Sequence, residues 1–141
     1  MTEPCIFKSE ISPQDIVQGD ISTCYFLSAV AALAEIPKRI RNLFLVTDIN
    51  REMYFCLRIL YKGEWKLIHL DEMIPCFADS HRMAFSRTTS SGLWVSLLEK
   101  AWAKLHGGYK RIECGYIEEG LHDLTGAPVK KYNLQYYSKS Q

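Results

Sequence analysis

The chain has 141 residues, of which 48% are hydrophobic and 23% charged, and its formal net charge is +1. This composition is typical of a single globular domain, residues 1–141, and excludes an intrinsically disordered chain. The nearly neutral charge gives no electrostatic reason to expect nucleic acid as a partner, and no apolar run is long enough for insertion into a membrane.

Cysteine usage indicates the redox compartment. The chain has five cysteines, an odd number, and they form no Cys-x-x-Cys motif. We therefore expect reduced thiols rather than disulfides or a zinc site. The N-terminal residues lack a basic region followed by an apolar one, so the expected location is cytoplasmic.

The first part of the chain is predicted to be extended and then helical. Residues 1–17 contain two prolines and no sustained period, which predicts a segment that wraps the core. Residues 24–36 are almost wholly apolar, and they predict a helix that is buried on every face and capped by Ser22 or Thr23. A short amphipathic helix is expected over residues 38–46. Its predicted inward side chains are Ile40, Leu43 and Phe44.

The middle of the chain predicts a β-hairpin. A polar turn over residues 47–52 leads into two stretches rich in strand formers, residues 53–60 and 65–70, with a turn at 61–64 between them. Residues 71–91 show no regular period, and their length predicts an irregular, mobile surface segment.

The next helix has the clearest amphipathic pattern of the chain. Apolar side chains recur at one-and-four spacing over residues 93–105, which predicts a helix capped by Ser91 and ended by Gly107. A shorter helix over residues 118–124 and a polar tail over residues 130–141 are expected to follow. The side chains of the 93–105 helix predicted to face solvent are Ser96, Glu99, Lys100 and Lys104.

Cys24 lies where a polar turn gives way to the first apolar helix. A helix start carries free N–H groups and the positive end of the macrodipole, which favour the reactive thiolate form of a cysteine. Gln18, slightly earlier in the chain, could direct its side-chain amide at the same helix end. Paired with the N–H of Cys24, it would provide two donors for the oxyanion of an acyl-transfer intermediate. Cys24 is therefore the candidate nucleophile and Gln18 the candidate oxyanion-hole residue.

Three stretches of the chain match a known pattern. Residues 18–27 read Gln-Gly-Asp-Ile-Ser-Thr-Cys-Tyr-Phe-Leu, residues 93–105 contain Leu-Leu-Glu-Lys-Ala-Trp-Ala-Lys, and residues 119–126 read Glu-Gly-Leu-His-Asp-Leu-Thr-Gly. In this order they resemble segments of the calpain family of papain-like cysteine proteases. The usual first segment of that family is Gln-Gly-x-Leu-Gly-Asp-Cys-Trp-Phe-Leu, so Ser22 and Thr23 replace its Gly and Asp.

The resemblance implies an α+β fold. It corresponds to the mainly helical left lobe of a papain-like architecture, arranged around a central buried helix, with a small antiparallel β-hairpin to one side. The two long helices are then expected to pack together. The predicted contacts join Trp94, Leu98 and Trp102 to residues such as Phe26, Val30 and Leu33.

The resemblance also implies that half of the catalytic machinery lies elsewhere. A cysteine protease needs an imidazole within hydrogen-bond reach of its thiol. In calpains this His and its Asn partner belong to a second lobe, and the corresponding Gly-His-Ala-Tyr-like and Asn-Pro-Trp-like motifs do not occur in this sequence. The histidines that do occur are interpreted as structural or solvated. They are His69, His81, His106 and His122.

Calcium is the cofactor that the resemblance suggests. Calpain cores bind Ca²⁺ in each lobe. In this lobe the family uses backbone oxygens before the nucleophile, an acidic side chain nine residues ahead of it and another in the Leu-Leu-Glu-Lys segment. Asp15 and Glu99 occupy the matching positions. Carboxylate oxygens suit Ca²⁺, but salt bridging or solvation explains two carboxylates far apart in sequence equally well.

Three functional interpretations follow. We favour the N-terminal, nucleophile-bearing lobe of a calpain-like, calcium-dependent cysteine endopeptidase, inactive as the isolated chain and completed by a His/Asn lobe in cis or in trans. Its partners would be protein or peptide substrates. The second interpretation is a degenerate, non-catalytic calpain-like module that scaffolds other proteins, which Ser22 and Thr23 favour. The third is an autonomous small enzyme that uses Cys24 with a local histidine.

Overall fold

The computed structural model describes residues 5–8, 10–47 and 54–137, and within them it has five α-helices and two small antiparallel sheets. This mixture confirms the predicted α+β class. The helices are α1 (Cys24–Ala34), α2 (Pro37–Arg41), α3 (Trp94–His106), α4 (Ile117–Thr125) and α5 (Leu134–Tyr137). The strands are β1 (Ile16–Val17), β2 (Tyr54–Tyr61), β3 (Glu64–Asp71) and β4 (Arg87–Thr88), and two short 3-10 helices span Pro13–Asp15 and Tyr109–Ile112.

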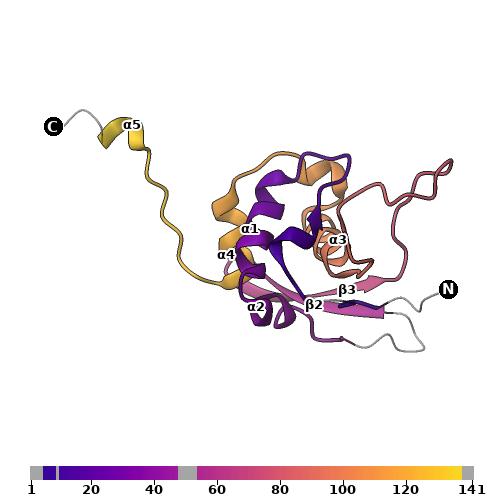
Figure 1. Cartoon of the computed structure of the whole chain (residues 1–141). Helices are drawn as coiled ribbons and strands as arrows, with labels where there is room; N and C mark the ends of the chain where they lie inside the picture. The colour runs from indigo at the N-terminus through magenta and orange to yellow at the C-terminus, as the bar shows by residue number, and fades with distance from the viewer. Residues whose placement is uncertain (1–4, 9, 48–53, 138–141) are drawn as a thin grey trace.

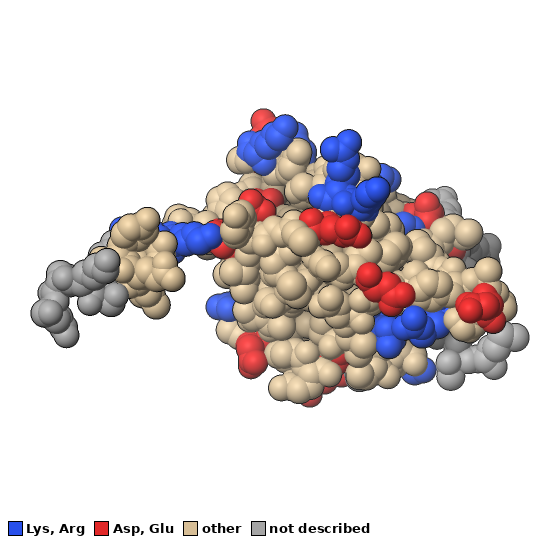
Figure 2. Space-filling view, turned by 90° about the horizontal axis from the view of Figure 1, so that it is seen from above, with Lys and Arg blue, Asp and Glu red and all other residues tan. Residues whose placement is uncertain are grey.

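The helices α1, α3 and α4 lie on the same side of the β2–β3 hairpin, and the last part of the described chain, with α5, runs away from this body (Figure 1). Within the described part of the chain, none of the helices has the length and apolar character needed to cross a bilayer. Lysine and arginine side chains are interspersed with aspartate and glutamate on the face shown in Figure 2. This mixture agrees with the nearly neutral net charge.

The predicted hairpin is confirmed. Tyr61 pairs with Glu64, so a two-residue turn of Lys62 and Gly63 connects β2 and β3. Both turn residues have positive φ, 52° and 80°, as a tight hairpin turn with the right twist requires. The polar turn predicted at residues 47–52 falls almost wholly outside the described residues.

The helix α1 differs from its prediction in length and in burial. It ends at Ala34 because Ile36, the residue before Pro37, adopts an extended conformation with φ −123°. The prediction of burial on every face was wrong, since a stripe along one face is exposed and begins at the first residue of the helix. The exposed side chains of α1 and of the residue that follows it are Cys24, Ser28, Ala32 and Glu35.

The helix predicted over residues 38–46 is shorter than expected. It ends at Arg41, after which Phe44 forms a bridge with Leu57 and the N–H of Leu45 donates to the Cys56 carbonyl at 2.8 Å. This pairing satisfies the backbone groups that a longer helix would have bonded internally. The prediction of its inward side chains is confirmed, because Ile40, Leu43 and Phe44 are all buried.

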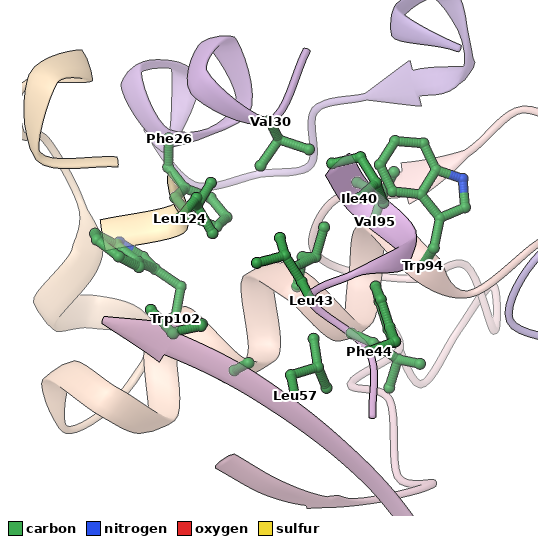
Figure 3. Close-up of a cluster of buried hydrophobic side chains, with 14 of the residues drawn as sticks. Phe26, Val30, Ile40, Leu43, Phe44, Leu57, Trp94, Val95, Trp102 and Leu124 are labelled. Carbon is green, nitrogen blue, oxygen red and sulfur yellow. The ribbon is translucent and has the colours of Figure 1, made fainter. Parts of the chain in front are cut away.

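The helix α3 supplies both buried indoles of the core. Trp94 and Trp102 are each 1% exposed, and Trp102 stacks on Phe26 of α1 with ring centroids 4.7 Å apart. Figure 3 shows Trp102 beside Phe26 and Leu124, while Trp94 lies at the other end of the cluster, toward Phe44. The predicted contact between the two long helices is confirmed at Trp102.

The ends of α3 are only partly as predicted. Gly107 ends it in the left-handed conformation, φ 92°, as expected. The predicted cap by Ser91 was wrong. At the helix start the N–H groups of Leu93 and Trp94 instead donate to the Ile6 carbonyl, at 3.0 and 3.1 Å. The N-terminal segment therefore holds the helix start by its backbone.

The polar face of α3 is also only partly solvent-exposed. Ser96 and Glu99 are 4% and 0% exposed, so their predicted contact with solvent was wrong. The reason is segment 84–90, which lies over this face and contributes β4, paired antiparallel with β1 through Ile16 and Thr88. Part of the stretch predicted to be irregular is thus a packed element.

The stacked pair of Phe26 and Trp102 provides a test of the core. Replacing Trp102 with alanine removes a fully buried indole, and we expect the free energy of unfolding to fall by about 3–5 kcal/mol. Trp65 is 45% exposed, so Trp65→Ala is the matched control and should cost less than half as much. Urea titration followed by far-ultraviolet circular dichroism measures both. Equal losses would contradict the described packing.

Candidate active site

Cys24 is the first residue of α1, and its side chain is exposed. The free N–H groups of the first helical turn and the positive end of the helix dipole therefore lie beside the sulfur. A shallow cavity of about 250 Å³ opens at this point. Besides Cys24, the residues that line it are Pro13, Ile16, Gln18, Leu27, Ser28 and Ala31.

Gln18 thus shares a cavity with Cys24. Its Nε2 donates to the Ile21 carbonyl at 3.2 Å, which turns the side chain back toward the residues just before the helix. A primary amide carries two N–H hydrogens, so the second is left for another acceptor. The role of this amide as an oxyanion donor stays a prediction.

The turn before Cys24 is held against segment 84–90. The N–H of Asp20 donates to the Ala84 carbonyl at 3.0 Å. Gly19 lies so close to Phe85 that a Cβ at position 19 would be 2.2 Å from its carbonyl carbon, which only glycine avoids. The turn and the segment therefore pack backbone against backbone.

Thr23 anchors the last residue of this turn in the interior. Its side chain is 0% exposed, and its Oγ1 donates to Oε1 of Glu99 at 2.5 Å. The backbone N–H of Ser86 donates to the other carboxylate oxygen of Glu99 at 2.8 Å. The prediction of a cap at Thr23 is therefore only half right: Thr23 is the N-cap residue, but its side chain makes no capping hydrogen bond.

Asp15, directly before β1, also anchors the chain in the interior through hydrogen bonds. Its carboxylate accepts hydrogen bonds from the Thr89 hydroxyl, from the N–H and the hydroxyl of Ser90, and from the indole of Trp94, at 2.5–3.3 Å. Burial alone would raise the pKa of Asp15, but these hydrogen bonds from Thr89, Ser90 and Trp94 together lower the pKa below its ordinary value.

Both predicted calcium ligands are therefore already hydrogen-bonded. Each oxygen of Asp15 accepts two hydrogen bonds, and each oxygen of Glu99 accepts one. Calcium needs six to eight oxygen ligands, and in the described part of the chain no three His, Cys, Asp or Glu side chains come together as a metal site. A calcium ion at Asp15 and Glu99 would have to compete with these hydrogen-bond donors, and calcium binding stays a prediction.

The other side of α1 is bordered by residues 112–115. The Tyr25 hydroxyl donates to the Ile112 carbonyl and accepts from the Trp102 indole, both at 3.1 Å. Burial raises the pKa of this hydroxyl above its ordinary value, and the hydrogen bond from Trp102 only partly offsets the increase. The N–H of Cys114 donates to the Ser22 carbonyl at 3.0 Å. Sequence reasoning missed these contacts, because partners so far apart in the chain leave no local signal.

All four histidines lie within the described residues, and none of them lines the cavity of Cys24. His106 and His122 instead line a cavity of about 430 Å³ beside α4. Their Nδ1 atoms are hydrogen-bonded to the carbonyls of Trp102 and Ala127, each at 2.9 Å. The cavity that holds Cys24 thus has no imidazole from this chain to accept the thiol proton.

An exposed thiol at the start of an anchored helix, beside an amide side chain, is suited to the nucleophilic half of a thiol hydrolase. The model of the family described as calpain family cysteine protease matches residues 1–141. The chain therefore belongs to the calpain family of cysteine proteases, as the resemblance predicts.

Individual relatives agree with this assignment. The chain is 37% identical over 134 residues to the calpain-type cysteine protease DEK1 of Arabidopsis thaliana, which covers 95% of the chain and 6% of that protein. It is 32% identical over 143 residues to calpain-10 of Mus musculus, which covers 97% of the chain and 21% of that protein. The chain thus spans between about one-twentieth and one-fifth of the length of these relatives.

The hydrogen bonds of Asp15 predict a pH dependence of stability. Because the folded-state pKa lies below the unfolded one, the charged carboxylate stabilises the fold at neutral pH, and this contribution is lost as pH falls below about 4. We expect Asp15→Asn to lower the free energy of unfolding at pH 7 by about 1–3 kcal/mol and to weaken its fall toward pH 3. Urea titrations between pH 7 and pH 3 measure this. The exposed Asp79→Asn is the control, and an equal effect there would contradict the role of Asp15.

Calcium binding is checked by isothermal titration calorimetry of the whole chain. An ion at Asp15 and Glu99 would have to displace hydrogen-bond donors, so we expect uptake only at millimolar concentrations and its loss in Asp15→Asn and Glu99→Gln. Tight binding that survives both substitutions would contradict this site. No uptake at all would remove calcium from this lobe.

Proposed function

We propose that residues 1–141 form the nucleophile-bearing lobe of a calpain-like cysteine endopeptidase, the left lobe of a papain-like architecture. Cys24 is the nucleophile, and a second lobe supplies the His and Asn that complete the site. The observation that carries this proposal is the exposed stripe of α1, which begins at Cys24 and borders the cavity shared with Gln18. The family membership of the chain supports the same reading.

The geometry suits the first step of peptide hydrolysis. The sulfur of Cys24 attacks the carbonyl carbon of the scissile peptide bond, and the negative charge moves to the carbonyl oxygen. The N–H of Cys24 and the free N–H of the Gln18 amide are the donors for this oxyanion. The imidazole of the second lobe, which has taken the proton of the thiol, gives it to the leaving amine as the C–N bond breaks, and water then hydrolyses the resulting thioester.

The second candidate is a non-catalytic calpain-like module that binds or scaffolds other proteins. It is favoured by Ser22 and Thr23 in place of the usual Gly and Asp, and by the hydrogen bond that directs the Gln18 amide to the Ile21 carbonyl. In this case the same exposed stripe of α1 would meet a protein partner rather than a substrate.

Thiol reactivity separates the two candidates. If Cys24 is the nucleophile, iodoacetamide should label it at least about tenfold faster than Cys76. Cys76 is also exposed and is the internal control. Mass spectrometry of tryptic peptides measures both rates, and Cys24→Ser should remove the fast phase.

Turnover is tested separately. Hydrolysis of a fluorogenic peptide is followed for the chain alone and with an added calpain lobe that carries the His and Asn. We expect hydrolysis only with the added lobe, and none with Cys24→Ser. Ordinary reactivity at Cys24 together with no hydrolysis after complementation would leave the scaffold reading.

A further inference from the structure

We propose that Glu99 is a positioning residue for Cys24 and acts through the hydroxyl of Thr23. The carboxylate lies on α3, has no contact with solvent, and accepts the Thr23 hydroxyl at 2.5 Å. Thr23 directly precedes the nucleophile in the chain. The proposal rests on the proposed function, because it concerns the geometry of the same thiol.

Thr23 determines where α1 begins. Its carbonyl accepts the N–H of Leu27 at 2.9 Å, the first hydrogen bond of the helix, and its own N–H donates to the Ile21 carbonyl at 2.9 Å. With the hydroxyl bound to Glu99, the backbone and the side chain of Thr23 are held at three points. The direction of the first helical turn, and with it the N–H and the sulfur of Cys24, follows from this residue.

Glu99 also joins the turn before Cys24 to segment 84–90. One oxygen of the carboxylate accepts the Thr23 hydroxyl, and the other accepts the N–H of Ser86. Two chain segments far apart in sequence are thereby fixed to one buried side chain. An ionised aspartate at position 23 would offer no hydrogen to this carboxylate, whereas the threonine of this chain does.

Four single substitutions test the proposal. Thr23→Val keeps the shape and removes the hydroxyl, Thr23→Ser keeps the hydroxyl, and Glu99→Gln turns one acceptor into a donor. Ser96→Ala is the matched control. The Ser96 hydroxyl ties the same segment to α3 through the Ser86 carbonyl, at 2.7 Å, but does not touch the nucleophile turn.

The first readout is the rate of iodoacetamide labelling at Cys24 relative to Cys76 in the same chain, measured between pH 5 and pH 9 on variants shown to be folded by circular dichroism. We expect Thr23→Val and Glu99→Gln to lower this ratio by about tenfold across this pH range. Thr23→Ser and Ser96→Ala should stay within about twofold of the unchanged chain. A purely structural role of segment 84–90 would instead make Ser96→Ala as damaging as Thr23→Val, which would overturn the proposal.

The second readout is amide hydrogen exchange of peptides that cover residues 18–27. Thr23→Val and Glu99→Gln should accelerate exchange there, and Ser96→Ala should not. Unchanged exchange in Thr23→Val overturns the positioning role even if Cys24 proves reactive. If Cys24 of the unchanged chain reacts no faster than Cys76 while exchange responds as expected, the proposed nucleophile fails and the anchoring of the turn by Glu99 stands.

Discussion

A carboxylate without access to water must find hydrogen-bond donors inside the protein. In this chain Glu99 is such a group, and its donors come from the residue before Cys24 and from segment 84–90. This requirement connects three parts of the chain: the turn before Cys24, the helix α3 and segment 84–90. Asp15 repeats the arrangement, with Thr89, Ser90 and the Trp94 indole as donors.

The buried carboxylates explain how α1 is held at its start while one of its faces stays exposed to solvent. α1 is held on one side by Phe26 against Trp102 and at its start by Thr23 against Glu99. These contacts leave the stripe that starts at Cys24 uncovered by any described part of the chain. An anchored helix with an uncovered stripe at Cys24 is the geometry that the proposed function requires.

The chemistry of the site is divided in the same way. The chain supplies a thiol, a helix start and an amide at one cavity, while His106 and His122 lie at another. An imidazole acts as a base only within hydrogen-bond reach of its partner. This separation of thiol and imidazoles is the reason why the proposed function assigns the base to a second lobe.

The sequence by itself determined the family, the α+β class, the hairpin, the long helices and the meeting of Cys24 with Gln18. Each depends on a pattern within a short stretch: apolar period, a positive-φ turn at Lys62 and Gly63, or a motif. Only the tertiary structure decided that Glu99 and Ser96 are buried and that α1 is exposed on one face. It also decided that the Thr23 side chain bonds Glu99 of α3 instead of capping α1. Burial of a polar side chain depends on which distant segment covers it, and that pairing is set by the packing of the whole chain rather than by neighbouring residues.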